Sequence, residues 1–420
     1  MAPISAAQLS EAVASEASTC VRFLTALVGE PSLRGHEQKA QELVASQLEG
    51  LGFEVQRLAL SESIREDPLA GVPAMSYEGR FNVLGVTPHD GRPSLLLNGH
   101  IDVVPVNTAT WSSDPFTPVV RDGWLYGRGA GDMKGGFAMA VLALRALHRL
   151  GAQPRHNLQF LSVIEEECTG NGTLAAMRAG VRADAVILPE PTNLNILVGG
   201  VAITWVTITI KFGGGHAESS DRITSPAQVV ARLVDSLGRL EFSFNEHPPV
   251  PFDSIARPYN INVGRIGLGE WPSSVPAVAE IEVRVGHPDS KSSEKICAEV
   301  EALVAETLVV AGSPPFEVVP SGFRAQGYHL AADHDLVRQV ANAHDYVHGV
   351  TPVAEVLGST TDARYYVNQL NVPALCFGPV VRNMHGSDEC VELASIERGA
   401  ATLAKFLLDY FNLEATEEAE

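Results

Sequence analysis

Four short strands, each apolar along its whole length, constrain the fold of this chain most strongly. Each runs straight into acidic residues or a histidine, and the four segments are 94–102, 158–167, 183–191 and 372–389. Strands that are apolar on both faces occur in mostly parallel sheets covered by helices. Residues 135–151 predict one such covering helix, because they are apolar on most sides. We therefore expect an α/β fold with a mostly parallel (mixed) sheet and helices on both faces.

The middle of the chain predicts a second, smaller unit. Residues 202–212 and 279–286 alternate apolar with polar residues, as half-exposed antiparallel strands do. Two amphipathic segments and a further strand complete a β-α-β-β-α order, which is typical of a ferredoxin-like α+β sandwich. A length of 420 residues also favours two domains. We predict a discontinuous main domain over 1–197 and 314–420, interrupted by an inserted domain over 198–313.

Charge and cysteine content narrow the class of protein. The formal net charge of -20 argues against nucleic acid or an anionic membrane as a partner, because both would repel the chain. The N-terminal residues lack the basic segment and apolar core of a signal peptide, and no apolar stretch is long enough to span a bilayer. The cysteines are scattered without a C-x-x-C pair, which fits a reducing compartment. We expect a cytoplasmic protein whose cysteines are small buried hydrophobes.

Side chains that can bind metal gather at the predicted ends of the apolar strands. His100, Glu166, Glu167, Glu190 and His385 all fall at or just beyond such ends. Ligand sites in open α/β sheets form beyond the carboxyl ends of the strands, so separate parts of the chain can deliver these residues to one crevice. Imidazoles and carboxylates together suit zinc, or cobalt or manganese, better than calcium or magnesium. The sequence therefore predicts a metal site there.

Two aspartates extend this set. Asp102 lies two residues after His100, where a carboxylate could orient a ligand imidazole, although the pair alone favours a structural histidine. Asp132 lies in "GRGAGDMKGG", which fails as a phosphate-binding loop because Asp132 replaces the last glycine and Lys134 lacks the flanking residues of a Walker loop. The aspartate suits a cation instead, and it is our candidate for a carboxylate that bridges two metal ions. On this segment alone, an aspartate at a helix N-terminus is an equal alternative.

Seven ordered motifs resemble one family of enzymes. They are "NGHIDVVPV", "WSSDPFTP", "DGWLYGRGAGDMKGG", "IEEECTGNGT", "PEPTN", "STTDARYY" and "MHGSDECV". In this order they resemble the metallopeptidase family of acetylornithine deacetylase, succinyl-diaminopimelate desuccinylase, aminoacylase and glutamate carboxypeptidase. The resemblance runs from about residue 20 to 410. It implies a catalytic domain of the zinc aminopeptidase type, with the inserted domain as a lid that often forms the dimer contact.

The resemblance implies a site for two zinc ions in each subunit. Asp132 would bridge the two ions. His100 and Glu190 would complete the ligands of one ion, and Glu167 and His385 those of the other. Cobalt or manganese could take the place of zinc in such a set.

The resemblance also implies which residues do chemistry. Glu166 matches the general base, Asp102 the aspartate behind a metal ligand, and His216 the lid histidine that stabilises the oxyanion, often from the partner subunit. The family usually continues from this histidine to a proline and a Gly-Asn pair, whereas this chain reads "HAESSDRITSPAQ". Without the family, a loop histidine such as His216 is more often plain surface.

Three residues are candidates for binding the substrate. Arg284 falls where the family keeps an arginine that grips a substrate carboxylate, and its alternation with apolar neighbours puts it on the polar face of its strand. An exposed salt bridge is the simpler interpretation of this arginine. Asn262 and Arg364 are weaker candidates for the same pocket.

Together these inferences predict a metal-dependent hydrolase that removes an N-acyl group, such as acetyl, succinyl or formyl, from an amino acid or small amine. A carboxypeptidase or dipeptidase that cuts a terminal peptide bond is the alternative within the same chemistry. A binding protein that has lost its metals fits less well, because the ligand positions and the base are all filled. A dinucleotide enzyme fits less well still, since the glycine fingerprint fails. We expect a homodimer formed through the lid.

Three consecutive glutamates, Glu165, Glu166 and Glu167, follow one of the apolar runs directly. Metal charge would offset the repulsion between buried carboxylates. Neighbours on a regular strand point to opposite faces, so the chain must bend if Glu166 and Glu167 are both to face the metals. Glu165 stands where the resembling family more often has aspartate, and no role for it follows from the sequence.

Overall fold

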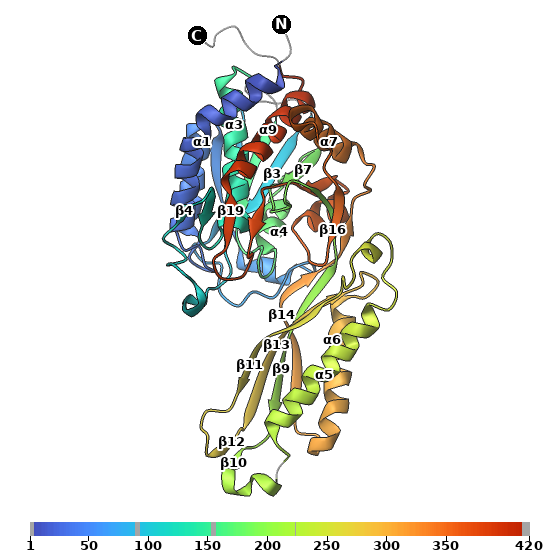
Figure 1. Ribbon diagram of the computed structural model, residues 1–420. Helices are drawn as coiled ribbons and strands as arrows, with labels where there is room; N and C mark the ends of the chain where they lie inside the picture. Colours follow the sequence, from blue (N-terminus) through green and yellow to red (C-terminus); the bar gives the residue numbers. More distant parts are fainter. Residues whose placement is uncertain (1–3, 89–92, 153–156, 223, 414–420) are drawn as a thin grey trace.

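Two lobes joined by a narrow neck make up the molecule (Figure 1). The structure is a computed structural model, and it describes residues 4–88, 93–152, 157–222 and 224–413. The larger lobe holds a nine-stranded sheet, and the smaller lobe holds a four-stranded sheet with helices α5 and α6 on one face (Figure 1).

The nine-stranded sheet is mixed, with parallel strands at its centre. Strand β3 pairs in parallel with β6 and β7, and β7 pairs in parallel with β17, whereas the strands toward both edges include antiparallel pairs. This confirms the predicted mixed, mostly parallel sheet. In spatial order its strands are β1 (Glu54–Ala59), β2 (Phe81–Val86), β6 (Leu158–Val163), β3 (Leu95–His100), β7 (Ala185–Leu188), β17 (Ala374–Cys376), β8 (Ile196–Gly200) and β15 (Tyr328–His329), with β16 (Ala354–Leu357) paired to β8.

Alternate side chains of the central strands enter two separate apolar clusters, one on each face of the sheet. Leu95 and Leu97 of β3 share a cluster with Phe137, whereas Leu96 belongs to a second cluster that includes Ala363. This period of two explains why these strands are apolar at every position. The helices of the larger lobe are α1 (Ala6–Gly29), α2 (Gln38–Gly50), α3 (Gly135–Arg149), α4 (Asn171–Arg178), α7 (Asp335–His348), α8 (Ala363–Tyr365) and α9 (Leu393–Tyr410).

The smaller lobe has its own core between its sheet and two helices. Ile281, Val283 and Val285 alternate along β13 and pack in one cluster with Val229 of α5 and Val300 of α6. The strand order is β11-β13-β9-β14, and every neighbouring pair is antiparallel. The elements are β9 (Ala202–Lys211), α5 (Pro226–Phe244), β11 (Ile261–Leu268), β13 (Val278–His287), α6 (Ser293–Leu308) and β14 (Phe316–Ala325), with the short pair β10 (Gly215–His216) and β12 (Ser274–Val275) at the tip (Figure 1).

The sheet of the smaller lobe extends further along the chain than the predicted boundary at residue 313. Strand β14 pairs with β9 along its length, so a sixth element follows the predicted β-α-β-β-α order. Pro320 interrupts the alternation of this strand, and a proline within an apolar run argues against a strand from sequence alone. As an edge strand, β14 tolerates the proline because no further strand among the described residues pairs with its outer side. The predicted outer ends of the main domain, 1–3 and 414–420, lie outside the described residues.

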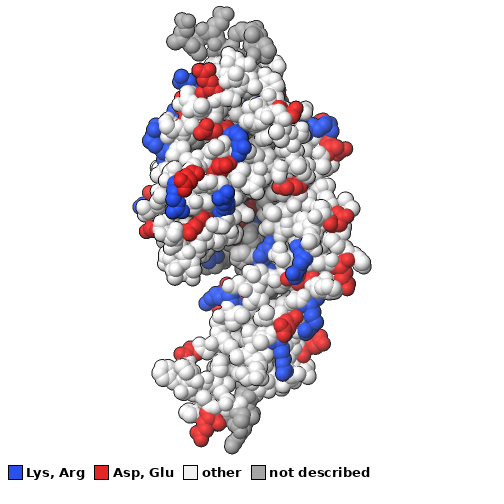
Figure 2. Space-filling view, in the orientation of Figure 1, with Lys and Arg blue, Asp and Glu red and all other residues white. Residues whose placement is uncertain are grey.

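Acidic and basic side chains are interspersed on the face of the molecule drawn in Figure 2, over both lobes. The described cysteines are all free, and Cys20, Cys168, Cys376 and Cys390 are buried. None of the helices in the described ranges combines the length and the apolar character that a membrane span requires.

Candidate metal centre

The carboxyl ends of three neighbouring parallel strands bring the candidate ligands to one edge of the larger sheet. Strand β3 ends at His100, which pairs with Val163 at the end of β6. Glu166 and Glu167 follow β6 directly, and Glu190 follows β7, the other neighbour of β3. The local sequence favours this placement because each apolar strand stops where its first charged side chains begin.

Two groups of ligand-type side chains lie at this edge, and Asp132 belongs to both. The first group is His100, Asp132 and Glu190, and the second is Asp132, Glu167 and His385. Within each group the potential ligand atoms all lie within 4.8 Å of one another. The structure therefore brings together all five side chains that the sequence singled out as ligands.

The distances within the groups are those expected of atoms that could share an ion. In the first group, the Nε2 atom of His100 lies 3.0 Å from Oδ1 of Asp132 and 3.8 Å from Oε2 of Glu190. In the second, the Nε2 atom of His385 lies 3.3 Å from Oδ2 of Asp132 and 3.1 Å from Oε2 of Glu167. The two oxygens of Asp132 thus face different groups, as a bridging carboxylate requires. Imidazole nitrogens and carboxylate oxygens are donors that zinc accepts.

The electrostatics of the two groups are those of cation sites. The carboxylate of Glu167 raises the pKa of His385 to about 11, and burial raises the pKa of Glu190 to about 8. Burial lowers the pKa of His100, but Asp132 and the neighbouring glutamates outweigh it and hold the pKa well above the usual value. Without a cation, the protonated imidazoles of His385 and His100 supply the positive charge that offsets the neighbouring carboxylates.

Glu166 lies at the border of the first group rather than within it. Its Oε2 atom is 4.0 Å from Nε2 of His100, and burial raises the pKa of this glutamate well above its usual value. The position leaves Glu166 next to the candidate ions without making it one of the ligands, which is where a general base must stand.

The sequence suggested that the carboxylate of Asp102 orients His100. In the structure this carboxylate makes other contacts. The strand ends at His100, and Nδ1 of the imidazole lies 3.0 Å from the backbone oxygen of Asp102 and 3.7 Å from its carboxylate. The carboxylate accepts hydrogen bonds from the backbone N–H groups of Glu166 and Glu167, each at 3.2 Å. Asp102 therefore holds the backbone of both Glu166 and Glu167.

Arg128 and Glu389 support the site and are residues that the sequence reasoning missed. Glu389 is fully buried and accepts hydrogen bonds from the backbone N–H groups of Gly131 (2.9 Å) and Asp132 (3.0 Å). It pairs with Arg128 at 2.5 Å, and Arg128 also donates to the backbone oxygen of His385. This pair ties the loop of Asp132 to the loop of His385. Both residues lie within motifs quoted above, but no sequence spacing predicts that they contact each other.

The residues assigned to the smaller lobe lie away from the ligands or at the neck. His216 is exposed on β10, which Figure 1 shows at the far tip of the smaller lobe. Arg284 on β13 lies directly opposite Asn262 on β11. The guanidinium of Arg284 donates to Oγ of Ser359 at 3.2 Å and to the backbone oxygen of Gly358 at 3.3 Å, so it links the smaller lobe to a loop of the larger one.

Arg364 is buried, with 2 % of its surface exposed. Its guanidinium donates to the backbone oxygen of Thr361 at 3.0 Å and lies 3.3 Å from the carboxylate of Asp362. These contacts hold the side chain within the larger lobe, where the charge of Glu166 also acts on it.

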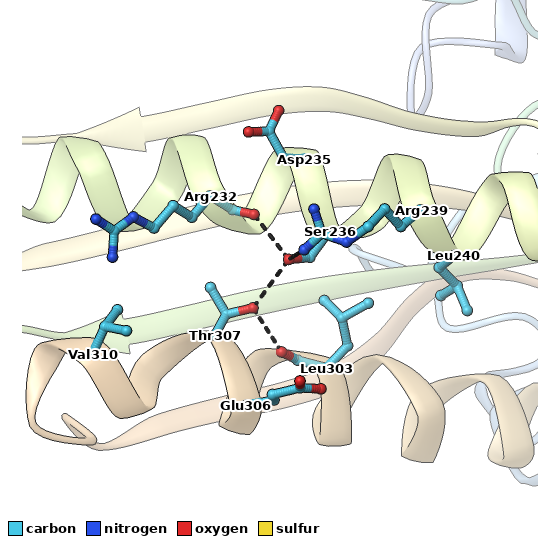
Figure 3. A pocket seen from close by; sticks show the side chains of 9 residues that line it. All are labelled: Arg232, Asp235, Ser236, Arg239, Leu240, Leu303, Glu306, Thr307 and Val310. Atoms are coloured by element: carbon cyan, nitrogen blue, oxygen red, sulfur yellow. Dashed lines mark hydrogen bonds between the residues drawn. The ribbon is translucent and has the colours of Figure 1, made fainter.

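A cavity of about 450 Å³ lies between α5 and α6, on the smaller lobe and apart from the ligands (Figure 3). Ser236 and Thr307, which line it, are linked by a hydrogen bond of 3.4 Å, and Arg239 also donates to Ser236 (Figure 3). These groups satisfy one another, and we assign no chemistry to this cavity.

The fold and the site together define a metal-dependent hydrolase of amide bonds. The chain belongs to Peptidase family M20/M25/M40, whose model matches residues 96–409. It is similar to succinyl-diaminopimelate desuccinylases, with 30% identity to the one from Methylobacterium radiotolerans over 93% of this chain and 96% of the relative. The one from Methylorubrum populi is 31% identical over 92% of this chain and 97% of the relative.

Solved structures share the fold. Human carnosine dipeptidase 1 superposes with a TM-score of 0.79 at 16% identity, covering 98% of this chain and 100% of the other. A family M20 metallo-carboxypeptidase from Sulfolobus solfataricus has a TM-score of 0.71 at 18% identity, covering 94% and 99%. A Bacillus subtilis peptidase described as dinuclear metal-binding has a TM-score of 0.60 at 14% identity, covering 95% and 99%.

Proposed function

We propose that this protein binds two zinc ions and removes an N-acyl group from an amino acid or a small amine. His100, Asp132 and Glu190 would hold one ion, and Asp132, Glu167 and His385 the other. The observation that carries the proposal is the pair of ligand groups that share Asp132, with Glu166 beside them. The similarity to succinyl-diaminopimelate desuccinylases favours a succinyl group over acetyl or formyl.

The residues around the proposed ions have different roles in hydrolysis. When bound, zinc polarises a carbonyl and makes water more acidic. Glu166 takes a proton from water and passes it to the leaving amine, since it is buried beside the site and is not itself a ligand. Asp102 holds the backbone of Glu166 and Glu167 through two hydrogen bonds. Both carboxylates therefore keep their orientation during turnover.

The smaller lobe acts as a lid and a dimer contact in this proposal. Strand β11 is an edge of its sheet, and Ile266 on this strand is 48% exposed. An edge strand with an exposed apolar side chain can pair with a second copy of the chain. His216, at the tip of the same lobe, would then stabilise the oxyanion in the active site of the partner subunit.

The residues proposed to bind the substrate lie near the neck between the lobes. Arg284 would bind a carboxylate of the substrate with its planar guanidinium, and Asn262, directly opposite on β11, would line the same pocket. Arg364 would act indirectly, by holding the loop of Thr361. The free cysteines fit a reducing compartment, and we propose a cytoplasmic location.

A substrate panel tests the proposed function. The purified protein is assayed with N-succinyl, N-acetyl and N-formyl amino acids and with dipeptides, each with added zinc or cobalt, and its metal content is measured. We expect hydrolysis of an N-acyl compound, fastest for N-succinyl, with about two ions per chain. Preferential cleavage of dipeptides would instead establish the carboxypeptidase or dipeptidase alternative. A protein that binds no metal and hydrolyses none of these compounds would contradict both.

A further inference from the structure

Glu165 is the member of the glutamate triplet that faces away from the ligand groups. It is completely buried, and its Oε1 atom accepts a hydrogen bond of 2.5 Å from Nη1 of Arg80. Its Oε2 atom accepts from the hydroxyl of Tyr77 at 2.7 Å and from that of Thr169 at 2.9 Å. Both oxygens of this buried carboxylate are therefore satisfied by side chains that leave it little freedom to move.

Arg80 and Tyr77 are themselves held in place. The other terminal nitrogen of Arg80 donates to Glu37 at 2.5 Å, and the guanidinium lies over the ring of Tyr77 at 5.3 Å. The hydroxyl of Tyr77 also accepts from the side-chain amide of Asn171 at 2.8 Å. A network whose members are all satisfied is rigid, and in a buried setting it fixes one arrangement of its groups.

The backbone of Glu165 makes the bend that the triplet requires. Its φ angle is 62°, in the left-handed region that residues other than glycine adopt rarely. Its backbone oxygen accepts from the N–H groups of Thr169 (3.1 Å) and Gly170 (2.7 Å), which closes the turn after β6. Since the next two residues carry the proposed base and a ligand, any rotation of this turn moves both of them.

We propose that Glu165 is a positioning residue. Its buried carboxylate, held by Arg80 and Tyr77, fixes the turn that directs Glu166 toward the scissile amide and Glu167 toward its metal ion. Asp102 also holds this turn, through hydrogen bonds to the backbone of these two residues. The inference rests on the proposed role of Glu166. It gives the first glutamate of the triplet a function without a contact to substrate or metal.

Glu165→Gln is the variant that tests this inference. The amide keeps the shape of the side chain but replaces one acceptor oxygen with a donor, which opposes the donors around it. We expect kcat to fall about 10- to 100-fold, because a small misplacement of a catalytic group costs rates of that order. KM should stay within about twofold, since no group that contacts substrate is removed. The absorption spectrum of the cobalt-loaded variant should also change, because Glu167 is a proposed ligand.

Glu37→Gln is the matched control. It removes the other carboxylate of the same arginine, at a similar depth, but leaves Glu165 bonded to Arg80, Tyr77 and Thr169. We expect it to lower the melting temperature but to change kcat and the cobalt spectrum less than Glu165→Gln does, because Arg80 keeps its bond to Glu165. If Glu37→Gln lowers kcat as much as Glu165→Gln does, the network is merely structural and the inference is wrong.

Two further variants keep the test decisive. Should Glu165→Gln fail to fold, Tyr77→Phe removes one hydrogen bond to the same carboxylate, and an unchanged kcat would overturn the inference. Glu166→Gln separates this inference from the proposed function. An active Glu166→Gln enzyme would refute the role of Glu166 itself, whereas an inactive one beside a fully active Glu165→Gln enzyme would refute only the role of Glu165.

Discussion

At the scale of single residues, the centre depends on Asp132, whose two oxygens face different ligand groups. The carboxylate can do this because its own backbone is fixed by Glu389, a buried acceptor on another loop. Second contacts of this kind set the orientation of a ligand and its affinity for metal. In the proposed centre, the orientation of a ligand therefore depends on a side chain that is not itself a ligand.

Replacing Glu166 by glutamine should abolish turnover and leave the metal content nearly intact. The amide cannot take a proton from water, but Glu166 is not among the ligand groups. We expect a loss of at least about 100-fold in kcat, by comparison with general bases elsewhere. Both kcat and the zinc content are measured on the same preparation. Substantial residual activity would show that another group is the base.

Metal affinity should rise with pH. In the metal-free protein, the carboxylates around His385 and His100 raise the pKa of both imidazoles, so each holds a proton at neutral pH. Zinc binds only the neutral ring, and binding therefore releases these protons. We expect the affinity to increase by about tenfold or more per pH unit between pH 6 and 8. Competition with a chelator at several pH values measures it, and an affinity independent of pH would contradict the assignment of the histidines.

At the scale of elements, close backbone approaches bring the ligand-bearing segments together. Helix α3 begins directly after the Asp132 loop, and a Cβ atom on its Gly136 would lie 1.7 Å from the backbone oxygen of Pro189. Pro189 immediately precedes Glu190. The missing side chain is thus what lets the Asp132 segment and the Glu190 segment approach each other.

Gly136→Ala should destabilise the protein and weaken metal binding. We expect a loss of about 1 to 3 kcal/mol in the free energy of unfolding, because the added methyl group must push the two segments apart. Gly238→Ala in α5 is the matched control, since a Cβ there would have no atom of the described residues within 4 Å. Its helix should gain up to about 1 kcal/mol. Urea unfolding of both variants measures the difference in their free energies of unfolding. Equal effects would show that α3 can shift to accommodate the added methyl group.

At the scale of the whole molecule, the separation of the lobes has a functional consequence. The ligands lie in the larger lobe, whereas His216 lies at the distal tip of the smaller one (Figure 1). If His216 takes part in catalysis as proposed, a second copy of the chain must bring it to the site. Each active site would then need two subunits.

Co-expression of two inactive variants tests this arrangement. His216→Ala alone should lose about 100- to 1000-fold in rate, as expected when one oxyanion donor is removed. A heterodimer of His216→Ala and Glu166→Gln chains contains one complete site if the histidine acts across the interface, and none if it acts within its own chain. We therefore expect activity in the purified heterodimer and almost none in either homodimer. An inactive heterodimer would rule out action across subunits.

Much of the fold and the gathering of the candidate ligands could be predicted because both depend on local patterns. Apolar strands that end in charged residues give the parallel sheet and place His100, Glu167 and Glu190 at one edge. Strand β14 could not be predicted in the same way, since Pro320 breaks its pattern and only pairing with β9 defines it. The contact of Asp102 also differed, because the strand ends at His100 and the side-chain alternation does not continue.

The sequence by itself determined the chemical nature of the site, since residue types and their order after the strands are local properties of the chain. Only the tertiary structure decided how each side chain is held. Arg80 and Glu165 lie 85 positions apart, and Arg128 and Glu389 lie 261 apart. Such pairs carry no periodic signal, because their contact exists only once the sheet and its connecting loops have folded. The physical reason is that burial makes an unpaired charge costly, so the fold, and not the local sequence, selects the partner.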